Sequence, residues 1–530
     1  MMAPDNGRAW RMGFWALLLG SLTIRLLAAG LVGLSTDESH YVLYSRHLAL
    51  GYFDHPPLVG FLGAAGLSIH DNALFARLGP ILCSTMSLLV LRCLALTLYG
   101  SEKVAFVASV FILVMPIQQL LGIALLPDAT LNLFWCGALL AAWHATRSGG
   151  WLAWLIMGAL FGGALLSKYH GALFPVCLFG FVATSAPMRR WLWSPKPYVA
   201  GLIGCLVFLP NVIWNYQHDW ISYAFQVGRG GGGGGFALTK VFSSIGAQML
   251  AASPVLFFVF IAACVRAFRS RPALEADRFL FWTSVPVFAV FGLIGMAGRM
   301  LPHWPAVGWW AGVLLMAAVV VRATDEAAET PVARKWKAWA LAAGVVAMVM
   351  VAALCVAVAY PVLGGAYGRV RDASIRMHVR FPAIPVLPLF ESGMDVTNDL
   401  YGWDAAARFV EKVREGMPNA SRTFVFSHRF YTTSQLAVFL KRDTAMLSLG
   451  PRPNQYSLWF SPSAHKGWDA VFVDDNHYMQ GGSRYRPLFE GMDEEPVRTQ
   501  VLRRGRVAHT LHVYRYYGFK GETVNEQGGK

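Results

Sequence analysis

The first long apolar run of the sequence reads FWALLLGSLTIRLLAAGLVGL, from Phe14 to Leu34. A helix rises about 1.5 Å per residue, so a run of about 20 residues can cross the hydrocarbon core of a bilayer. Comparable apolar runs recur as far as about Pro361. The sequence therefore predicts a polytopic α-helical membrane protein.

The composition excludes several other classes of protein. The 530 residues are 55% hydrophobic and 14% charged, whereas a soluble domain carries about 25% charged residues. A soluble enzyme, a fibrous protein and a disordered chain are therefore excluded. Much of the net charge of +15 is explained by the basic residues that collect in cytoplasmic loops, so we expect no nucleic-acid partner.

The seven cysteines all lie in apolar segments, and none follows Cys355. This excludes a disulfide-framed exported domain, and we expect buried free thiols. The N-terminus has a basic start, with Arg8 and Arg11, before its apolar run. This resembles a signal peptide, but the run reaches Leu34 without a convincing A-x-A cleavage site, so we expect a retained first span.

We expect about eleven transmembrane helices, near residues 14–34, 73–98, 104–122, 129–146, 151–167, 171–186, 197–215, 241–265, 279–298, 304–321 and 338–361. Sixteen lysines and arginines fall on one side of this map: Arg8, Arg11, Arg92, Lys103, Arg147, Arg189, Arg190, Lys196, Arg266, Arg269, Arg271, Arg278, Arg322, Arg334, Lys335 and Lys337. Five fall on the other: Arg46, Lys168, Arg229, Lys240 and Arg299. The basic side is predicted to be cytoplasmic.

An odd number of spans places the tail outside the cytoplasm. We therefore divide the chain into a transmembrane domain, residues 1–361, and an extracytoplasmic domain, residues 362–530. Within the tail the pattern predicts a helix around Phe409–Val413, with Asp404 as its N-cap and Gly416 and Pro418 as its stop. Short strands are predicted at Thr423–Ser427, Ala445–Leu449, Ala470–Val473 and Leu511–Tyr516, with a helix at Thr433–Leu440. This order indicates a small mixed α/β domain.

A tract of seven glycines, Gly228 and Gly230–Gly235, lies in the outer loop between the seventh and eighth spans. It lacks the strand, the helix and the Lys-Ser/Thr pair of a phosphate-binding loop. We therefore interpret it as a flexible lid or linker.

Polar chemistry collects at the outer membrane face. The first outer loop contains Asp37 and Glu38 directly after the first span, and then Asp54 and His55. A short amphipathic helix at Tyr41–Leu50, lying on the membrane surface, would bring Asp54 back towards Asp37. A carboxylate at the lipid boundary can accept a proton from an acceptor hydroxyl, although a solvated loop with acids at the interface is the alternative interpretation.

Four further motifs face the same side. They are Leu126-Pro127-Asp128-Ala129, Ser167-Lys168-Tyr169-His170-Gly171, Asn215-Tyr216-Gln217-His218-Asp219-Trp220 and Arg299-Met300-Leu301-Pro302-His303-Trp304-Pro305. Taken singly, Asp128 could be an N-cap, and Lys168 and Arg299 could be snorkelling anchors. Together they supply acids, cations and hydroxyls to one vestibule.

These motifs resemble a known family. The acid pair Asp37-Glu38, the G-Y-F-D-H-P-P-L motif at 51–58, Pro127-Asp128 and the K-Y-H-G turn at 168–171 are similar to the bacterial branch of glycosyltransferase family 39. This is the protein O-mannosyltransferase-like group of the GT-C fold, which also covers transferases of aminoarabinose to lipid A and of galacturonate to lipopolysaccharide. The similarity extends into the tail through D-L-Y-G-W at 399–403 and N-Q-Y at 454–456.

The resemblance implies a donor with one sugar on a polyprenyl phosphate, and transfer with inversion at the extracytoplasmic face. It implies that Asp37 is the catalytic base and Glu38 its neighbour. Asp54 corresponds to the second acidic motif of the family, which in the aminoarabinose enzymes precedes a phosphate-binding lysine. Here His55 follows instead, and this departure speaks against aminoarabinose as the sugar.

A neutral imidazole donates one hydrogen bond and carries no charge, so binding of the donor phosphate is expected to depend on other cations. The candidates are Lys168, His170 and Arg299, and we place Asp128, Tyr169 and His303 in the same donor site. A phosphate leaving group needs no acid, and cations at the headgroup level can offset its charge. One alternative left open is a divalent metal ion on Asp54, Asp128 and a histidine, although the spacing matches no metal motif.

Two other functions remain as alternatives. A transporter or flippase usually holds its ionisable groups near the midplane, often in paired repeats, whereas only Arg25 falls clearly inside a span here. A polymerase of lipid-linked glycans would differ by a donor that carries an oligosaccharide. The resemblance to the bacterial branch implies a protein of a bacterial inner membrane with its active site facing the periplasm. Its acceptor, whether lipid A, lipopolysaccharide, another glycan or a protein, is left open.

Overall fold

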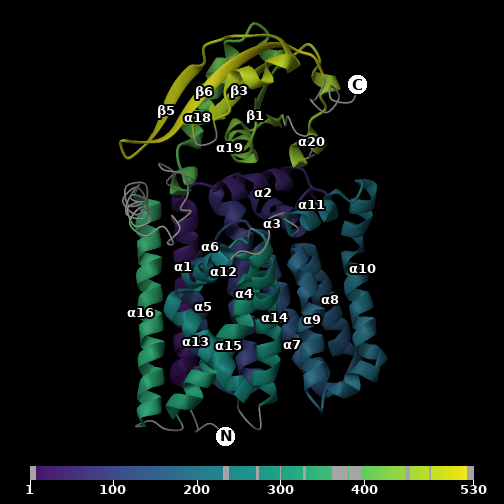
Figure 1. Ribbon diagram of the computed structural model, residues 1–530, viewed down its shortest axis with the longest axis vertical. Coiled ribbons are helices and arrows are strands. Elements are labelled where there is room, and N and C mark those ends of the chain that lie inside the picture. Colours follow the sequence, from purple (N-terminus) through teal and green to yellow (C-terminus); the bar gives the residue numbers. More distant parts are fainter. Residues whose placement is uncertain are drawn as a thin grey trace. The chain divides into compact units, whose positions relative to one another are not determined.

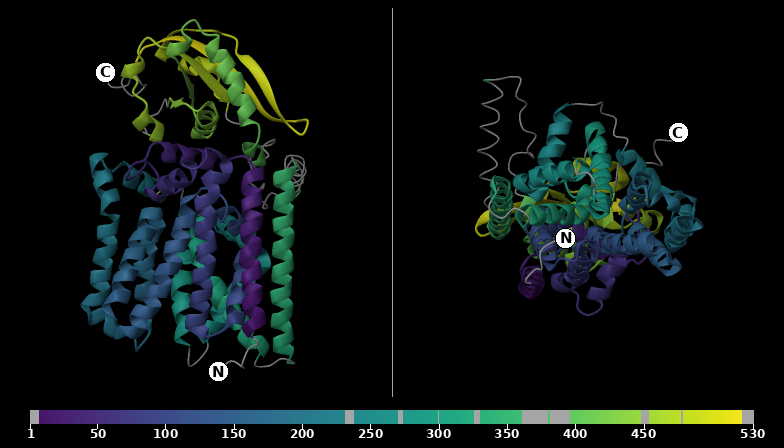
Figure 2. Two further views of the ribbon diagram at one scale, coloured as in Figure 1. Left: turned by 180° about the vertical axis from the view of Figure 1, so that it is seen from behind. Right: turned by 90° about the horizontal axis from the view of Figure 1, so that it is seen from below.

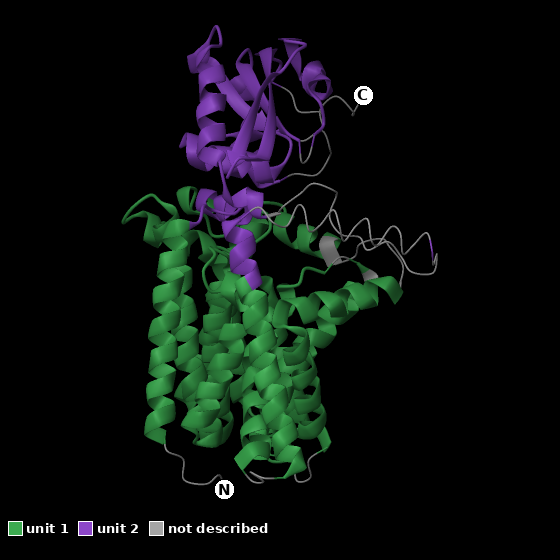
Figure 3. Cartoon of the chain, turned by 90° about the vertical axis from the view of Figure 1, so that its left-hand side faces the viewer, with its two compact units in different colours: residues 1–31, 44–352 green, residues 32–43, 353–530 purple. Residues whose placement is uncertain are grey.

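The computed structural model describes residues 7–230, 238–269, 274–298, 300–325, 330–360, 380, 396–447, 454–476 and 479–521. The chain forms two compact units (Figure 3). The first comprises residues 1–31 and 44–352, and the second comprises residues 32–43 and 353–530. The second unit thus includes a short segment, residues 32–43, that begins at the end of the first apolar run. The division into domains 1–361 and 362–530 stays a prediction.

The first unit is a bundle of helices (Figures 1 and 2). Its longer helices are α1 (Gly7–Leu31), α4 (Ala73–Tyr99), α5 (Glu102–Val114), α7 (Pro127–Ser148), α8 (Trp151–Ser167), α9 (Leu173–Thr184), α10 (Pro195–Gln217), α12 (Leu238–Ala252), α13 (Pro254–Arg269), α14 (Glu275–Ala297), α15 (Gly308–Asp325) and α16 (Pro331–Ala359). Shorter elements are α3 (Leu58–Leu67), α6 (Pro116–Leu121), η1 (Tyr169–Ala172), η2 (Arg189–Trp193), α11 (Ile221–Gly230) and η3 (Trp304–Val307). Helix α2 (Thr36–Arg46) continues from one unit into the other, as does α16.

The helix ends follow from local chemistry. Asn72 caps α4 by accepting the backbone N–H of Phe75, and Gly100 ends that helix with a φ of +64°. Ser101 then caps α5 by accepting the N–H of Val104. Glycine adopts a positive φ without a steric cost, and serine is a favoured N-cap, so this Gly-Ser pair forms the tight turn between two antiparallel helices.

The core of the bundle surrounds α15, which is buried along almost its whole length. A helix that is apolar on all sides is expected at such a central position. Helices α3, α6, α11 and α12 gather at one end of the bundle, the end at which α1 finishes (Figure 1). Two of them, α3 and α11, belong to predicted outer loops, which therefore lie at the same end of this unit.

Two of the predicted spans are broken helices. Residues 104–122 form α5 and α6, separated at Met115, and residues 241–265 form α12 and α13, which are bent by 103°. Each break precedes a proline, Pro116 or Pro254, and proline disfavours helical geometry in the residue before it. Ser253 has a φ of +95° at the sharper bend.

The structure confirms a mostly helical membrane-type chain with a small C-terminal sheet. Within the described residues, six helices are long and apolar enough to cross a membrane, or seven if α12 and α13 form one span. They are α1, α4, α10, α14, α16 and the continuous helical stretch Trp304–Asp325. The number eleven stays a prediction.

The second unit contains a mixed sheet. Its strands are β1 (Thr423–Ser427), β2 (Ala445–Met446), β3 (Asp469–Asp475), β4 (Phe489–Met492), β5 (Val497–Arg503) and β6 (Arg506–Phe519), in the order β2-β1-β3-β6-β4, with β5 also on β6. The first three are parallel, and β6 is antiparallel to its neighbours. The remaining elements are η4 (Val396–Leu400), α18 (Trp403–Glu415), η5 (Ala420–Arg422), α19 (Phe430–Leu440), α20 (Gln455–Trp459), η6 (Ser463–His465) and η7 (Gly482–Leu488).

Side chains alternate between the two faces of this sheet. Val471 and Val473 of β3 pack with α18 on one face. Ala470 and Phe472 join an aromatic core on the other face, with Tyr485 of η7. The alternation of small aliphatic and aromatic residues thus fixes the register of the strands.

Most of the predicted tail elements are present, with three corrections. The strand predicted at Ala445–Leu449 is only two residues long. Asp404 is not the N-cap of α18, because Gly402 holds that position and Asp404 lies in the first turn. Strands β4 and β5 are missing from the prediction, because β4 has only four residues and the outward positions of β5 include the polar residues Arg498 and Gln500.

The cysteines are free, as predicted, but not all are buried. Cys93, Cys205 and Cys355 are exposed, because apolar residues of a membrane helix also cover its lipid-facing side. Of the glycine tract, Gly228 and Gly230 lie within α11, and residues 231–235 lie outside the described residues.

Candidate active site

Two predicted site residues of the first unit form a buried ion pair. The Nζ atom of Lys168 lies 2.8 Å from each carboxylate oxygen of Asp128, and the two side chains are 4% and 5% exposed. Lys168 ends α8 in an extended conformation and so turns the chain into η1. Two alternative interpretations are therefore wrong: Leu126 holds the N-cap position of α7, and Lys168 is not a snorkelling anchor.

Histidines from two other segments lie near this pair. His303 and His55 both act electrostatically on Asp128. The loop that carries His303 is fixed by Gln248, whose Nε2 donates to the carbonyl of Pro302 at 2.9 Å. Arg299 lies outside the described residues, so its predicted role stays a prediction.

The G-Y-F-D-H segment packs on the second half of α2. Tyr44 donates to Oδ1 of Asp54 at 2.5 Å, and His55 Nε2 lies 3.9 Å from Oδ2 of the same residue. Tyr52 stacks on Tyr44 with ring centroids 3.8 Å apart and donates to its carbonyl at 2.9 Å. Gln226 of α11 donates to the carbonyl of Asp54 at 2.5 Å. Asp54 is thus held between α2 and α11.

A polar network joins two more of the predicted motifs. Tyr169 and Tyr223 both donate to Oδ1 of Asn211, at 3.5 and 3.3 Å. Asn215 donates to the same oxygen at 3.3 Å, and Asn211 donates to the carbonyl of Leu50. His170 packs against aromatic rings instead, with Phe291 at 4.7 Å and Trp304 at 6.0 Å between centroids. The first unit therefore brings together the motifs around residues 50, 128, 168, 215 and 303.

The acid pair Asp37-Glu38 lies in the first turn of α2, where it belongs to the second unit. Glu38 is 1% exposed, and its Oε2 accepts the N–H and the hydroxyl of Ser35 at 2.9 and 3.0 Å. The Ser35 hydroxyl accepts the N–H of Glu38 in return, at 3.4 Å. This reciprocal arrangement is a capping box. Asp37 is exposed, so the two neighbouring acids have different surroundings.

The first turns of α2 are held by α19. Ser434 donates to the carbonyl of Thr36 at 3.2 Å, and Gln435 donates to the carbonyl of Leu34 at 3.0 Å. Ser39 donates to Gln435 Oε1 at 2.9 Å. The His40 ring lies 3.0 Å from the hydroxyl of Tyr456. The C-terminal segment therefore fixes the start of the helix that carries Asp37.

The predicted amphipathic helix at Tyr41–Leu50 is wrong in its boundaries. The helix begins at Thr36 and ends at Arg46. Acids in a first turn are stabilised by the helix dipole, and the Ser35 cap starts the helix earlier than its apolar pattern suggests. Asp37 and Glu38 are therefore helical residues and not loop residues.

The described residues contain no group of three or more His, Cys, Asp or Glu side chains that could hold a metal ion. Both oxygens of Asp128 bond to Lys168, so the donor set considered for Asp54, Asp128 and a histidine does not fit a divalent ion.

Several known proteins are similar to this chain. A family model described as dolichyl-phosphate-mannose-protein mannosyltransferase matches residues 54–214. The lipid A galacturonosyltransferase RgtD of Rhizobium johnstonii is 26% identical over 331 residues, which are 59% of this chain and 65% of RgtD. The chain thus matches slightly less than two thirds of the length of that relative.

The structure is similar to ArnT from Cupriavidus metallidurans in the apo state, with a TM-score of 0.58, 17% identity, and coverage of 96% of this chain and 98% of ArnT. The chain has the GT-C fold. ArnT bound to undecaprenyl phosphate gives a TM-score of 0.56 at 17% identity, with coverage of 95% and 98%. The resemblance to GT-C glycosyltransferases that the sequence motifs indicate is therefore confirmed.

Sequence reasoning missed several of the residues that hold the predicted site residues in place. The spacing of Ser35 and Glu38 is a capping-box signal that would have placed Glu38 correctly. Tyr44, Asn211 and Gln435 had no comparable signal, because their partners are distant in the sequence and single polar residues in apolar surroundings fit no motif.

Proposed function

We propose that the chain is an integral-membrane inverting glycosyltransferase. It moves one sugar from a polyprenyl-phosphate donor to an envelope acceptor at the extracytoplasmic face. The observation that carries this proposal is the exposed carboxylate of Asp37 on a helix start fixed by Glu38 and α19. The similarity to lipid A galacturonosyltransferase RgtD supports a glycolipid or glycan acceptor.

Asp37 is the general base in this proposal. A base must lie within hydrogen-bond reach of the acceptor hydroxyl. Asp37 is exposed and can be reached by an acceptor from solvent, whereas Glu38 is 1% exposed and its Oε2 accepts two hydrogen bonds from Ser35. Glu38 is therefore a positioning residue that stabilises the turn carrying Asp37.

The donor site is proposed at the Asp128–Lys168 pair and its histidines. The fold is that of ArnT, which has been solved with undecaprenyl phosphate, and this supports a polyprenyl-phosphate donor. Because Asp128 already offsets the charge of Lys168, the donor phosphate needs further cations. We assign this role to Arg299, with His55, His170 and His303 donating hydrogen bonds and Tyr169 lining the sugar.

We place the chain in a bacterial inner membrane, with Asp37 and the C-terminal sheet in the periplasm. The positive-inside count supports this orientation. A cysteine introduced at Asn419, between α18 and β1, should react with a membrane-impermeant maleimide added to intact spheroplasts. Cysteines introduced at residues 190 and 334 should react only after permeabilisation. Labelling of the Asn419 variant only from the cytoplasmic side would contradict the orientation.

The function is tested by mass spectrometry of lipid A, lipopolysaccharide core and polyprenyl phosphates from cells with and without the gene. We expect one sugar to disappear from a glycolipid or glycan and its lipid-linked form to accumulate. This result would identify both donor and acceptor. Identical glycans in the two strains would contradict the proposal.

The bend of 103° between α12 and α13 favours the flippase alternative, because broken helices are common in transporters. The same experiment separates the two functions. If the protein were a flippase, its loss would leave the lipid-linked sugar trapped on the cytoplasmic leaflet, and the purified protein would make no new glycosidic bond. A polymerase would lengthen a glycan by repeating units instead of one sugar.

A further inference from the structure

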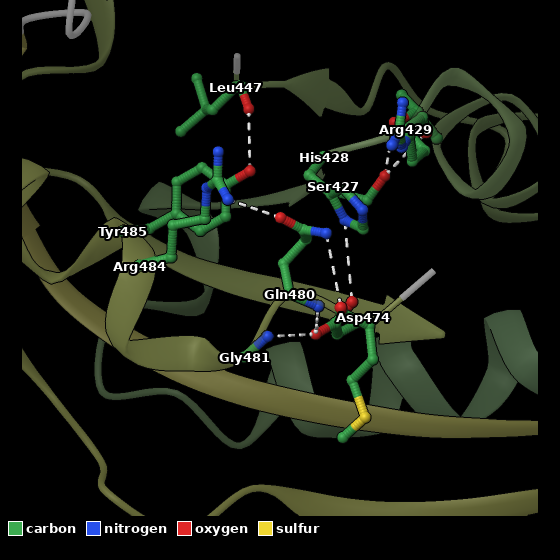
Figure 4. Close-up of polar contacts among 11 residues, drawn as sticks. Ser427, His428, Arg429, Leu447, Asp474, Gln480, Gly481, Arg484 and Tyr485 are labelled. Atoms are coloured by element: carbon green, nitrogen blue, oxygen red, sulfur yellow. Dashed lines mark hydrogen bonds and ion pairs between the residues drawn. The ribbon is translucent and has the colours of Figure 1, made fainter. Parts of the chain in front are cut away.

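The chain crosses its C-terminal sheet at a switch point between β1 and β3. From β1 it passes through α19 to β2 on one side, and from β2 it returns through α20 to β3 on the other side. Ligands of open α/β sheets bind outside the carboxyl ends of the strands at such a point. His428 follows β1, and Asp474 is the penultimate residue of β3 (Figure 4).

Asp474 occupies a position at which the strand pattern predicts an apolar side chain. Ala470 and Phe472, on the same face of β3, belong to the aromatic core, whereas Asp474 places a fully buried carboxyl group there. Its Oδ2 accepts the backbone N–H groups of Gln480 and Gly481, at 2.9 and 2.8 Å (Figure 4). Among the described residues its Oδ1 accepts no hydrogen bond. The turn at Gln480 and Gly481 therefore provides hydrogen bonds to Oδ2 of Asp474 and not to Oδ1.

Histidines flank Asp474 on the neighbouring segments. The Nδ1 atom of His428 lies 3.7 Å from Oδ1 of Asp474, and His512 is directly opposite Asp474 in the β3–β6 pair. Residues directly opposite in adjacent strands point to the same face. His512 Nδ1 is buried and has no hydrogen-bond partner in the described part of the chain. A buried polar atom without a hydrogen bond is costly. Two such atoms among the described residues, Asp474 Oδ1 and His512 Nδ1, therefore indicate a polar ligand at the row formed by His428, Asp474 and His512.

The surroundings of this row are cationic. Arg429 follows His428, and Arg484 donates to Gln480 Oε1 at 2.5 Å (Figure 4). Both arginines and Asp474 act electrostatically on Tyr485. The adjacent acid, Asp475, points to the opposite face of β3, where it bonds to His509 at 3.0 Å. The exposed rim therefore favours an anionic ligand.

We propose that this row binds an acidic saccharide. Asp474 Oδ1 accepts a sugar hydroxyl, the imidazoles of His428 and His512 bond to neighbouring hydroxyls, and Arg429 and Arg484 bind a phosphate or carboxylate substituent. The identity of the ligand rests on the proposed function: it is the glycan part of the acceptor, held by the C-terminal unit.

The test is binding to the full-length protein in detergent, measured by ligand-observed proton and phosphorus NMR. The probe is glucosamine 6-phosphate, compared with glucosamine and with inorganic phosphate. We expect the phosphorylated sugar to bind at least tenfold more tightly than either half. Asp474→Asn keeps an oxygen for the two backbone N–H groups but loses the charged acceptor, so it should weaken binding about tenfold.

Two variants keep this test decisive. Asp475→Asn, on the opposite face of the same strand, should bind the probe like the wild type. Arg484→Gln, at an exposed position, should weaken binding of glucosamine 6-phosphate and leave that of glucosamine unchanged. Equal binding of the three probes to wild type, or wild-type binding by a folded Asp474→Asn protein, would overturn the proposal. The assay needs no donor and no turnover, so a failure of sugar transfer would count against the proposed function and not against this site.

Discussion

Two carboxylates lie in the first turn of a helix, Asp37 in α2 and Asp128 in α7, and their surroundings are opposite. Asp128 is buried, and both of its oxygens accept hydrogen bonds from Lys168. Asp37 is exposed, and its neighbour Glu38 is the buried acid. An ammonium partner lowers the basicity of a buried carboxylate. The comparison therefore supports the proposed roles, which are charge placement for Asp128 and proton transfer for Asp37.

Breaking the buried pair should have the largest effect on stability. Lys168→Met leaves Asp128 buried without its cation, which typically costs about 3–5 kcal/mol. The double variant Lys168→Met/Asp128→Asn should regain much of this loss. Thermal unfolding of the purified protein in detergent measures both effects.

Lys103→Met is the matched control, because Lys103 pairs with Asp325 at 2.5 Å but both side chains are partly exposed. Such surface pairs contribute about 0–1 kcal/mol. Equal losses of stability in Lys168→Met and Lys103→Met would show that burial of the Asp128–Lys168 pair does not increase the cost of breaking it.

Changes at Glu38 should have a smaller effect, because this acid acts through the helix start. Glu38→Ala removes the acceptor for Ser35, and loss of such a cap costs about 1 kcal/mol. Glu38→Gln retains a capping box and should transfer sugar at a rate closer to wild type than Glu38→Ala. The two variants are compared by transfer rate and by thermal unfolding. If Glu38→Gln lost as much activity as an Asp37 variant at full stability, Glu38 would have a direct part in the chemistry.

The smallest effect is expected at the buried pair of Asp475 and His509. It should appear as a pH dependence of the stability of the folded protein. Burial disfavours the charged form of His509, but its hydrogen bond to Asp475 outweighs this and raises the pKa of the imidazole above its usual value. A raised pKa stabilises the folded state fully below the unfolded value of about 6.5, and the stabilisation is lost as the pH rises through the folded value.

The unfolding temperature of the full chain should therefore fall as the pH increases above about 6.5, and His509→Gln should reduce that dependence. The measurement is thermal unfolding of both proteins between pH 6 and pH 9. Identical pH profiles would show that the His509–Asp475 pair does not couple to stability.

The sequence predicted the features that depend on local pattern. Thr423–Ser427 is a strand with the predicted bounds, because it is a β-rich run between polar residues. The gathering of Asp128, Lys168 and His303 also follows from the loop map. The apolar pattern alone could not show which acid is buried, because Asp37 and Glu38 are adjacent, and only the capping-box spacing of Ser35 and Glu38 distinguishes them.

Other features depend on long-range contacts or on the local path of the backbone. Nothing in residues 32–43 indicates that Gln435, about 400 positions later, would bond to Leu34. Likewise, residues 241–265 have the composition of one straight span, but Ser253 and Pro254 bend the helix by 103°. Hydrophobic composition reports burial in lipid or protein, and it does not report the path of the backbone.

The central claim is that Asp37 accepts the proton of the acceptor. Its most direct test is the transfer rate of Asp37→Asn with the donor and acceptor identified by mass spectrometry. Asp71→Asn is the control, because Asp71 is an exposed acid that pairs with Arg46 at the surface, at 3.4 Å. We expect Asp37→Asn to lower the rate by about 10²–10⁴-fold, with unchanged donor binding and unfolding temperature, and Asp71→Asn to retain the wild-type rate. A near-wild-type rate for Asp37→Asn would contradict the account and leave Asp54 as the next candidate for the base.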